Sequence, residues 1–232
     1  MRGLLNEINN IKKWMVILGE NIEYNIDEFH IDTGMYPEFN LEKFKSLTSF
    51  KDRVAYCNAT LKKLGAGSSR VVYQIDPVTV LKLAKNGRGV QQNRTEANEY
   101  GHDYFSEVRT NVYDYDDENE LWVISEMGKP ITPEVFEKET GINFRLFDHY
   151  VQLREGQNNG KKITDKDFLT YMTPDQLKLM DDDDFVAKVV EFMFNNGLSA
   201  GDVGRISSWG IVNRDGHNMV VLMDYGYTGS YK

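Results

Sequence analysis

The 232-residue chain contains little cysteine, little proline and no long apolar run. Its single cysteine, Cys57, cannot form a disulfide within the chain, so we expect an intracellular, cytoplasmic protein. No apolar segment approaches the length of a membrane span, and the short segment WMVILG is flanked by polar residues. We therefore expect neither a membrane anchor nor a signal peptide.

Positive charge is also scarce. Lys and Arg number 27 against 36 Asp and Glu, which gives a net charge of −9. An acidic surface repels phosphate backbones and anionic lipids, which argues against nucleic acid and membrane partners. The length is sufficient to bury a hydrophobic core, and it fits one large domain or two small lobes.

The pattern of apolar residues divides the chain into three segments. Residues 1–63 are predicted to form a helical N-terminal extension, with helical spacing clearest in LLNEINNIKKWMVIL. Residues 64–128 combine β-branched runs with one polar helix, and their first half predicts a two-strand unit that turns at Asp76 and Pro77. Residues 129–232 are mostly helical and end in a hairpin. This order predicts an α+β fold in which a strand-rich lobe precedes a helix-rich lobe.

Three polar features are better explained by structure than by chemistry. Cys57 lies in a helical pattern where a buried position is favoured over a nucleophile. His30 stands alone among acidic and aromatic residues, as a surface or structural histidine does. The acidic run 181–184 precedes an apolar helix, where it favours the helix dipole without any metal.

A glycine-rich segment, LGAGSSRVVY, is the first candidate for anion binding. Gly65 and Gly67 allow backbone amides to approach an anion closely, and Ser68 and Ser69 add donors. A tight hairpin turn is the alternative explanation of the two glycines. The segment is neither a Walker loop nor a dinucleotide fingerprint, because it lacks Gly-Lys-Ser/Thr and a strand follows it rather than a helix.

The second candidate is a lysine inside an apolar strand. In VTVLKLAKN, strand alternation places Val80, Lys82 and Ala84 on one face. A buried lysine must find a counter-charge or an anion. Glu96 in the following helix is a suitable partner, and Glu99, one turn further along, is an alternative. An ordinary structural salt bridge would produce the same pattern.

The C-terminal hairpin brings two carboxylates together. The segment WGIVNRDGHNMVVLMDYG predicts two strands with a turn at 214–216. The first strand begins soon after Asp202 and the second ends at Asp224, so both carboxylates should lie at the same end of the hairpin. Opposite a lysine and a glycine loop, carboxylates can hold magnesium while the lysine holds phosphates.

Taken in this order, these segments resemble the protein-kinase-like fold. The spelling Gly201-Asp202 is closer to the aminoglycoside-phosphotransferase branch than to His-Arg-Asp protein kinases. LGAGSSRVVY, VLKLAKNGRGVQQNRTE and GDVGRISSWGIVNRDG are similar to uncharacterised kinase-like proteins of bacteriophages and bacteria, which implies a host-cell cytoplasmic location if the protein is phage-encoded. The resemblance covers about residues 50–227 and implies two lobes, a helical N-terminal extension and a short C-terminal lobe.

The resemblance also implies ATP and magnesium as ligands and gives roles to individual residues. Lys82 would bind phosphates with Glu96 as its ion-pair partner, and Asp202 would be the catalytic-loop aspartate. Asp224 would bind the metal. The expected cofactor-binding residues are Gly65, Gly67, Ser68, Ser69, Lys82, Glu96 and Glu126, the last at the end of the strand before the linker.

The departures from the family pattern concern the same site. Arg70 stands where the third glycine of the loop is expected, and Ala200 replaces the histidine of the catalytic loop. The metal-binding asparagine is missing, and Ser207 or Ser208 lies in its place. Only six residues follow Gly226, so we expect no activation segment there and no peptide-substrate platform.

Two functions of different classes follow. The first is a nucleotide-binding, weak or atypical phosphotransferase. The alternative is a pseudokinase-type module that binds a partner protein and has no catalytic activity. A third idea is transfer of AMP instead of phosphate, which no residue selects. The retained Lys82, Asp202 and Asp224 favour an enzyme, whereas the missing asparagine favours the pseudokinase.

Overall fold

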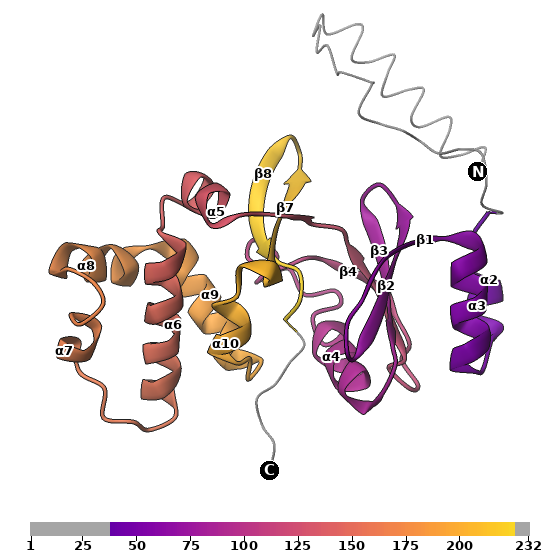
Figure 1. Ribbon diagram of the computed structural model, residues 1–232, viewed down its shortest axis with the longest axis horizontal. Helices are drawn as coiled ribbons and strands as arrows, with labels where there is room; N and C mark the ends of the chain where they lie inside the picture. Colours follow the sequence, from indigo (N-terminus) through magenta and orange to yellow (C-terminus); the bar gives the residue numbers. More distant parts are fainter. Residues whose placement is uncertain (1–37, 226–232) are drawn as a thin grey trace, which may run out of the picture. The chain divides into compact units, whose positions relative to one another are not determined.

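Residues 38–225 are described in the computed structural model of the protein, and all of them belong to one compact unit, Pro37–Lys232. Two predictions, the helix near the N-terminus and the isolated His30, lie outside the described residues. Figure 1 shows the described chain running from two helices through a sheet to a set of helices and a last hairpin.

A five-stranded antiparallel sheet forms the first lobe, with the strand order β1-β2-β3-β5-β4. β2 and β3 pair over their whole length, so that Val72 lies opposite Lys82. β3 also pairs with β5, which makes it the central strand. The strands are β1 (Lys62–Ala66), β2 (Arg70–Asp76), β3 (Thr79–Ala84), β4 (Val112–Tyr115) and β5 (Trp122–Glu126).

Two helices, α2 (Leu41–Ser46) and α3 (Phe50–Thr60), cover one face of this sheet (Figure 1). Asn40 and Ser49 cap their N-termini through side-chain oxygens that accept backbone N–H groups. Leu81 and Leu83 of β3 point to this side and are buried in one cluster with Cys57. Burial raises the pKa of the Cys57 thiol to about 12, so the prediction of an inert, buried helical cysteine is confirmed.

β1 was not predicted, since the sequence indicated only a two-strand unit here. All five of its residues are exposed, and KKLGA shows no alternation of apolar and polar residues. β1 forms because its backbone pairs with β2, through a register that shifts between Lys63 and Gly65. A strand stabilised by pairing alone leaves no hydrophobic period in the sequence.

The helix α4 (Gly87–Ala97) lies on the other face of the sheet, between β3 and β4 in the chain. The Asn86 side chain accepts a hydrogen bond from the backbone N–H of Gly89 and caps the helix. A Cβ added at Gly89 would lie 2.3 Å from the carbonyl oxygen of Ser69. The absence of a side chain there therefore lets α4 approach the loop between β1 and β2.

The second lobe is built from helices around its own core. Thr132, Asn143, Thr173 and Asp183 cap four of these helices through their side chains. Of the acidic run 181–184, Asp183 and Asp184 begin the apolar helix α9 as predicted, whereas the first two acids end α8 instead. The helices are α5 (Pro133–Thr140), α6 (Phe144–Asn158), α7 (Asp165–Phe168), α8 (Pro174–Asp182), α9 (Asp184–Asn195), α10 (Ala200–Val203) and the 3-10 helix η2 (Ile206–Ser208).

The predicted C-terminal hairpin is confirmed. β7 (Trp209–Arg214) and β8 (His217–Leu222) are joined by Asp215 and Gly216, whose φ values are 53° and 81°. Positive φ at both turn residues matches the right-handed twist of a hairpin, which explains why Asp-Gly occurs here. The short strand β6 (Lys129–Pro130) pairs with β7 and completes a small sheet.

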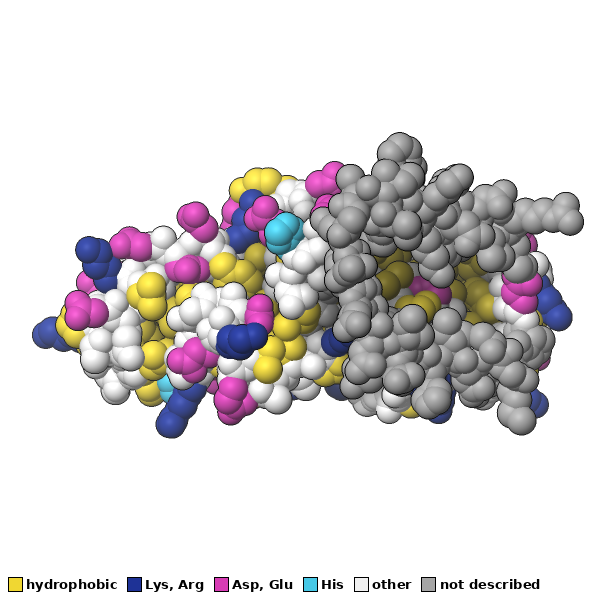
Figure 2. All heavy atoms as spheres, turned by 90° about the horizontal axis from the view of Figure 1, so that it is seen from above, with side chains coloured by type: hydrophobic (Ala, Val, Ile, Leu, Met, Phe, Trp, Pro, Cys, Tyr) yellow, Lys and Arg dark blue, Asp and Glu magenta, His cyan; other side chains and the backbone are white. Residues whose placement is uncertain are grey.

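Two separate hydrophobic cores result, one under the five-stranded sheet and one among α5, α6, α9 and the hairpin. The expected α+β fold, with a strand-rich lobe before a helix-rich lobe, is therefore confirmed. None of the helices within residues 38–225 is long and apolar enough to cross a membrane. On the described part of the face in Figure 2, acidic and basic side chains are interspersed rather than gathered by sign.

Candidate active site

Lys82 is buried in the middle of the central strand β3, on the face turned towards α4. Its Nζ donates to Oε2 of Glu96 at 2.7 Å, and Glu96 is fully buried. The alternative partner, Glu99, instead pairs with Arg109 at 2.9 Å. The choice left open by the sequence is thus resolved in favour of Glu96, because Glu96 faces the sheet whereas Glu99 meets the segment that follows α4.

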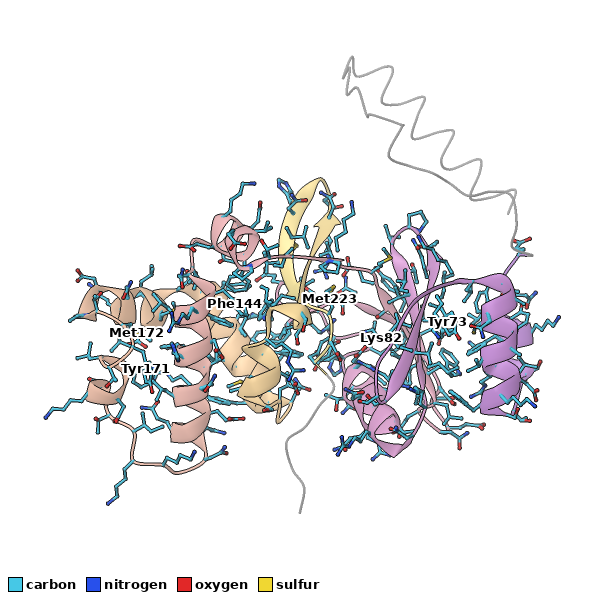
Figure 3. All side chains as sticks on the ribbon, in the orientation of Figure 1. Tyr73, Lys82, Phe144, Tyr171, Met172 and Met223 are labelled. Atoms are coloured by element: carbon cyan, nitrogen blue, oxygen red, sulfur yellow. The ribbon has the colours of Figure 1, made fainter. Side chains whose placement is uncertain are left out.

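Lys82 also connects the two lobes. Its Nζ donates to the backbone carbonyl oxygen of Met223 at 2.7 Å. Figure 3 labels Lys82 on β3 and Met223 just after β8, on the two sides of this contact. A Cβ at Gly128 or Gly210 would lie 2.6 or 2.3 Å from the Met223 sulfur, so these two glycines make room for the methionine.

Arg70, the first residue of β2, is a second buried cation beside Lys82. Its Nη1 lies 2.6 Å from Oε1 of Glu96, and its Nη2 lies 2.5 Å from Oδ1 of Asp224. The two oxygens of Glu96 are thus divided between Arg70 and Lys82. Sequence reasoning noted Arg70 only as a missing glycine, and its place at the centre of an ion-pair network was not predicted.

Burial and neighbouring charges act differently on the two cations. Burial lowers the pKa of Lys82 below its ordinary value, and the charge of Arg70 adds to this, although Glu96 opposes it. Burial also opposes the charge of Arg70, but Glu96 and Asp224 outweigh burial and raise its pKa. Arg70 is therefore the permanent cation of the network, and Lys82 is the one whose charge depends on its partners.

The glycine loop between β1 and β2 is held against the start of α4. Lys85 Nζ donates to the carbonyl oxygen of Gly67 at 2.8 Å, and Asn86 donates to that of Ser68 at 3.1 Å. The Ser69 hydroxyl donates to Oε1 of Gln92 at 2.6 Å. Gly67 and Ser69 line two cavities, whereas Gly65 lies within β1 and lines neither.

Asp202 and Asp224 come together as the hairpin geometry predicted. Both line one polar cavity of about 410 Å³, together with Gly67, Ser68 and Ser69. Asp202 lies in the short helix α10 rather than in an irregular loop, while Asp224 follows β8 directly. Two carboxylates and the glycine loop therefore share one space, although the loop lies more than 130 residues before either carboxylate in the chain.

The two aspartates have different surroundings. Burial raises the pKa of Asp202, and the negative charge of Asp224 adds to this, while Arg205 opposes it. Oδ2 of Asp202 is buried and has no hydrogen-bond partner within residues 38–225. The Asp224 side chain is 59% exposed, and Arg70 neutralises its charge. Asp202 is thus the carboxylate better suited to accept a proton.

The two serines in the place of the missing asparagine are not equivalent. Ser207 is exposed and lines the second, larger cavity together with Asp224. Ser208 is buried, and its backbone carbonyl accepts the N–H of Met223. Ser207 is therefore the serine placed to contact a bound molecule.

The second cavity, of about 440 Å³, is the apolar part of the site. Its walls come from the glycine loop, β2, β3 and the linker after β5, and Lys82 and Asp224 lie at its polar end. This volume falls within the range of small-molecule sites, which are mostly apolar with a few placed polar groups. Among its apolar lining residues are Leu64, Val72, Val80, Met127, Pro130 and Met223.

Glu126, expected to contact a cofactor, lines the apolar cavity but uses its carboxylate elsewhere. Oε1 accepts a hydrogen bond from Arg214 at 3.0 Å, and Oε2 accepts the backbone N–H of Asn111 at 3.1 Å. Arg214 also donates to the backbone carbonyls of Ser106 and Arg109. The Glu126 side chain thus connects the linker to the hairpin, a role that no pattern in the sequence indicated.

The arrangement shown offers a divalent cation few donors from the protein. Within the described residues, no group of three or more His, Cys, Asp or Glu side chains is placed to hold a metal ion. One oxygen of Asp224 is engaged by Arg70, and the neighbouring Ser207 offers only a neutral hydroxyl. Asp224 and Ser207 would be the donors for magnesium if Arg70 released the carboxylate, and the predicted metal site stays a prediction.

No protein-family model matches the sequence. No curated protein matches it either.

Solved structures with a related arrangement are found at low identity. They include the ternary complex of the phosphotransferase APH(2″)-IIa with streptomycin and ATP, at 15% identity and a TM-score of 0.34, covering 78% of this chain and 71% of that one. Another is SAICAR synthase from Saccharomyces cerevisiae in complex with SAICAR, at 11% identity and a TM-score of 0.31, covering 71% and 73%. The GDP complex of aminoglycoside 2′-phosphotransferase-IIIa has 11% identity and a TM-score of 0.33, covering 80% and 70%. At such scores these likenesses carry no argument about this chain, and the function has to be argued from its own site.

Proposed function

We propose that the chain is a protein-kinase-like nucleotide-binding protein that takes ATP in the apolar cavity. The buried Lys82–Glu96 pair carries this proposal, because its lysine lines that cavity. A lysine is tolerated in the centre of an apolar strand because Glu96 compensates its charge, and a lysine held in place in this way can bind phosphates. The apolar walls suit a flat base, and the glycine loop suits the phosphates next to it.

Within this proposal the residues have distinct tasks. Lys82 would bind the phosphates, and Gly67 with Ser68 would cover them from the loop. Asp202 would accept the proton of an acceptor hydroxyl as its oxygen bonds to the terminal phosphorus and the bond to the nucleoside diphosphate breaks. Positioning and charge neutralisation supply most of the rate in reactions of this class.

We propose that any such transfer is weak. Arg70 engages Asp224 and shares Glu96 with Lys82, so the charges that should meet the phosphates are already paired with each other. Phosphoryl transfer depends on charges that are preorganised towards the transferring group. We expect turnover well below the roughly 1–100 per second that is typical of kinases.

The second candidate function is a pseudokinase-type module that binds a partner protein. The same Arg70–Asp224 pair at 2.5 Å favours it, because a carboxylate held by arginine is withdrawn from metal chemistry. The two candidates can be distinguished by measurement. The phosphotransferase requires nucleotide binding and detectable hydrolysis, whereas the partner-binding module requires neither.

The test is thermal unfolding with and without ATP. ATP at a hundred times its dissociation constant should add about 2.7 kcal/mol to the free energy of unfolding. Lys82→Met should fold but lose most of this stabilisation, whereas Lys178→Met, an exposed lysine on α8, should keep it. Equal ATP stabilisation in the parent and Lys82→Met would show that Lys82 does not bind phosphates. If ATP gives no stabilisation in the parent, nucleotide binding is wrong and the partner-binding module remains.

A further inference from the structure

The charges around Glu96 balance without any metal. Arg70 and Lys82 carry two positive charges, and Glu96 and Asp224 carry two negative ones. Each carboxylate has an arginine nitrogen within 2.6 Å. Because Oδ1 of Asp224 already contacts Arg70, a divalent cation that used this oxygen would have to displace the arginine.

The position of Arg70 in the chain makes this displacement unfavourable. The residue begins β2, and its neighbours Val71 and Val72 are paired in the sheet, so its backbone is fixed. Its guanidinium is buried, and its two Nη atoms contact different carboxylates. A planar guanidinium with fixed, divergent donors loses little freedom on forming such bonds and is charged at every accessible pH.

Arg70 also reaches the space where phosphates would lie. It lines the same cavity as Lys82 and Asp224, directly after the glycine loop. A guanidinium binds phosphate oxygens in the same bidentate manner as it binds carboxylates. The side chain that engages the predicted metal-binding carboxylate can therefore also contact the phosphates that a metal would otherwise neutralise.

We propose that Arg70 is a built-in cation that replaces a divalent metal at Asp224, so that this site binds a nucleoside triphosphate without a metal requirement. This inference rests on the proposed nucleotide binding for its second half only. The pairing of Arg70 with Asp224, and its exclusion of metal, can be tested without any nucleotide.

The first experiment measures binding of Mn²⁺ alone, by the loss of its free electron-paramagnetic-resonance signal. The parent should bind it weakly. Arg70→Ala should bind it at least about tenfold more tightly, equivalent to about 1.4 kcal/mol, because Asp224 is then free. The double variant Arg70→Ala/Asp224→Asn should lose the gain. As a control, Arg94→Ala removes an exposed arginine of α4 that pairs with Glu120 at 2.6 Å, and this variant should behave as the parent.

The second experiment measures ATP affinity by calorimetry in Mg²⁺ and in EDTA. In the parent the two dissociation constants should agree within about threefold, whereas Arg70→Ala should bind ATP about tenfold more weakly in EDTA than in Mg²⁺. An equally strong metal requirement in the parent and the variant would overturn the inference while leaving nucleotide binding intact. If no variant binds ATP, the proposed function fails, and the Mn²⁺ result alone decides whether Arg70 excludes metal.

A folding control keeps the test decisive. Arg70→Lys keeps one positive charge but cannot span both carboxylates, so it should also gain Mn²⁺ binding. If Arg70→Ala does not fold, judged by the loss of a cooperative thermal transition, Arg70→Lys takes its place in both experiments. Unchanged Mn²⁺ affinity in a folded Arg70→Lys would overturn the inference.

Discussion

Asp202 shows a conflict between stability and chemistry in a single residue. Burial and the charge of Asp224 raise its pKa, and its Oδ2 has no partner within the described part of the chain. An ionised group in such surroundings destabilises the folded state relative to the unfolded one. A carboxylate of this kind gains its missing hydrogen bond when a hydroxyl binds, which suits the role proposed for it.

The change Asp202→Asn should therefore stabilise the protein at pH 7. Because the folded-state pKa is raised, the destabilisation is fully present above that pKa and vanishes below the ordinary value of about 3.9. The gain in melting temperature over the parent should shrink as the pH falls from 7 towards about 4. Thermal unfolding of the parent and of Asp202→Asn across this pH range measures the difference in melting temperature. A variant that is less stable than the parent at pH 7, by the same amount at every pH, would contradict the prediction.

The division of Glu96 between two cations is a second feature of residue scale. Lys82 alone would give the ion pair predicted from the sequence, and Arg70 changes the site because it takes the second oxygen of Glu96. Truncating one member of a buried ion pair usually leaves its partner without a counter-charge. Here Glu96 keeps one cation, Arg70 or Lys82, when the other is removed. This redundancy explains why Lys82→Met and Arg70→Ala are both expected to fold.

Among the elements, the helix α4 and the glycine loop form one unit. The cap of α4, Asn86, also donates to the loop at Ser68, and Gln92 of α4 receives the hydroxyl of Ser69. Only glycine at position 89 allows the helix and the loop to approach this closely. The helix therefore positions both the loop and Glu96.

Two glycines in the first turn of α4 provide a matched comparison. A Cβ at Gly89 would lie 2.3 Å from the Ser69 carbonyl oxygen, whereas a Cβ at Gly87 meets nothing within 4 Å. Gly89→Ala should lower stability by about 1–3 kcal/mol through overpacking, and it should weaken ATP binding because the loop shifts. Gly87→Ala should be neutral or stabilising by up to about 1 kcal/mol. Urea unfolding measures the stability of the two variants, and titration with ATP measures their affinity. Equal effects of the two changes would contradict the conclusion that close contact between α4 and the glycine loop depends on Gly89.

At the scale of the whole molecule, a few polar contacts connect the two hydrophobic cores. Lys82 reaches Met223, Arg70 reaches Asp224, and Arg214 of the hairpin reaches Glu126 at the end of β5. The cavities lie where these contacts meet. Since both lobes supply walls of the same site, a ligand bound there should stabilise the molecule as a whole.

Arg214 should contribute more to stability than other surface arginines of this lobe. Arg214→Ala leaves the buried Glu126 without its counter-charge and should cost roughly 3 kcal/mol. Arg205→Ala removes a side chain that is 63% exposed and should change stability by no more than about 0.5 kcal/mol. Urea unfolding gives both values. Adding Glu126→Gln to Arg214→Ala should restore part of the loss, and the absence of any recovery would count against the buried pair as its cause.

Much of the local structure was predictable because it depends on neighbours in the chain. Alternation along β3 predicted that Lys82 lies on one face of the strand and that Leu81 and Leu83 lie on the other. The Asp-Gly turn set the pairing register of the hairpin. The hairpin in turn predicted that Asp202 and Asp224 meet, since its first strand begins at the end of the hairpin where its second strand finishes. Periodicity and turn chemistry act over a few residues, so a sequence displays them directly.

The sequence by itself therefore determined the α+β class, the buried lysine, the C-terminal hairpin and the two converging aspartates. Only the tertiary structure decided that Glu96 and not Glu99 meets Lys82, that β1 exists, and that Ser207 rather than Ser208 faces the cavity. It also decided that Arg70 pairs with Asp224, 154 residues away. Such pairings depend on where separate elements place their side chains, and no local pattern of residues encodes that distance or direction.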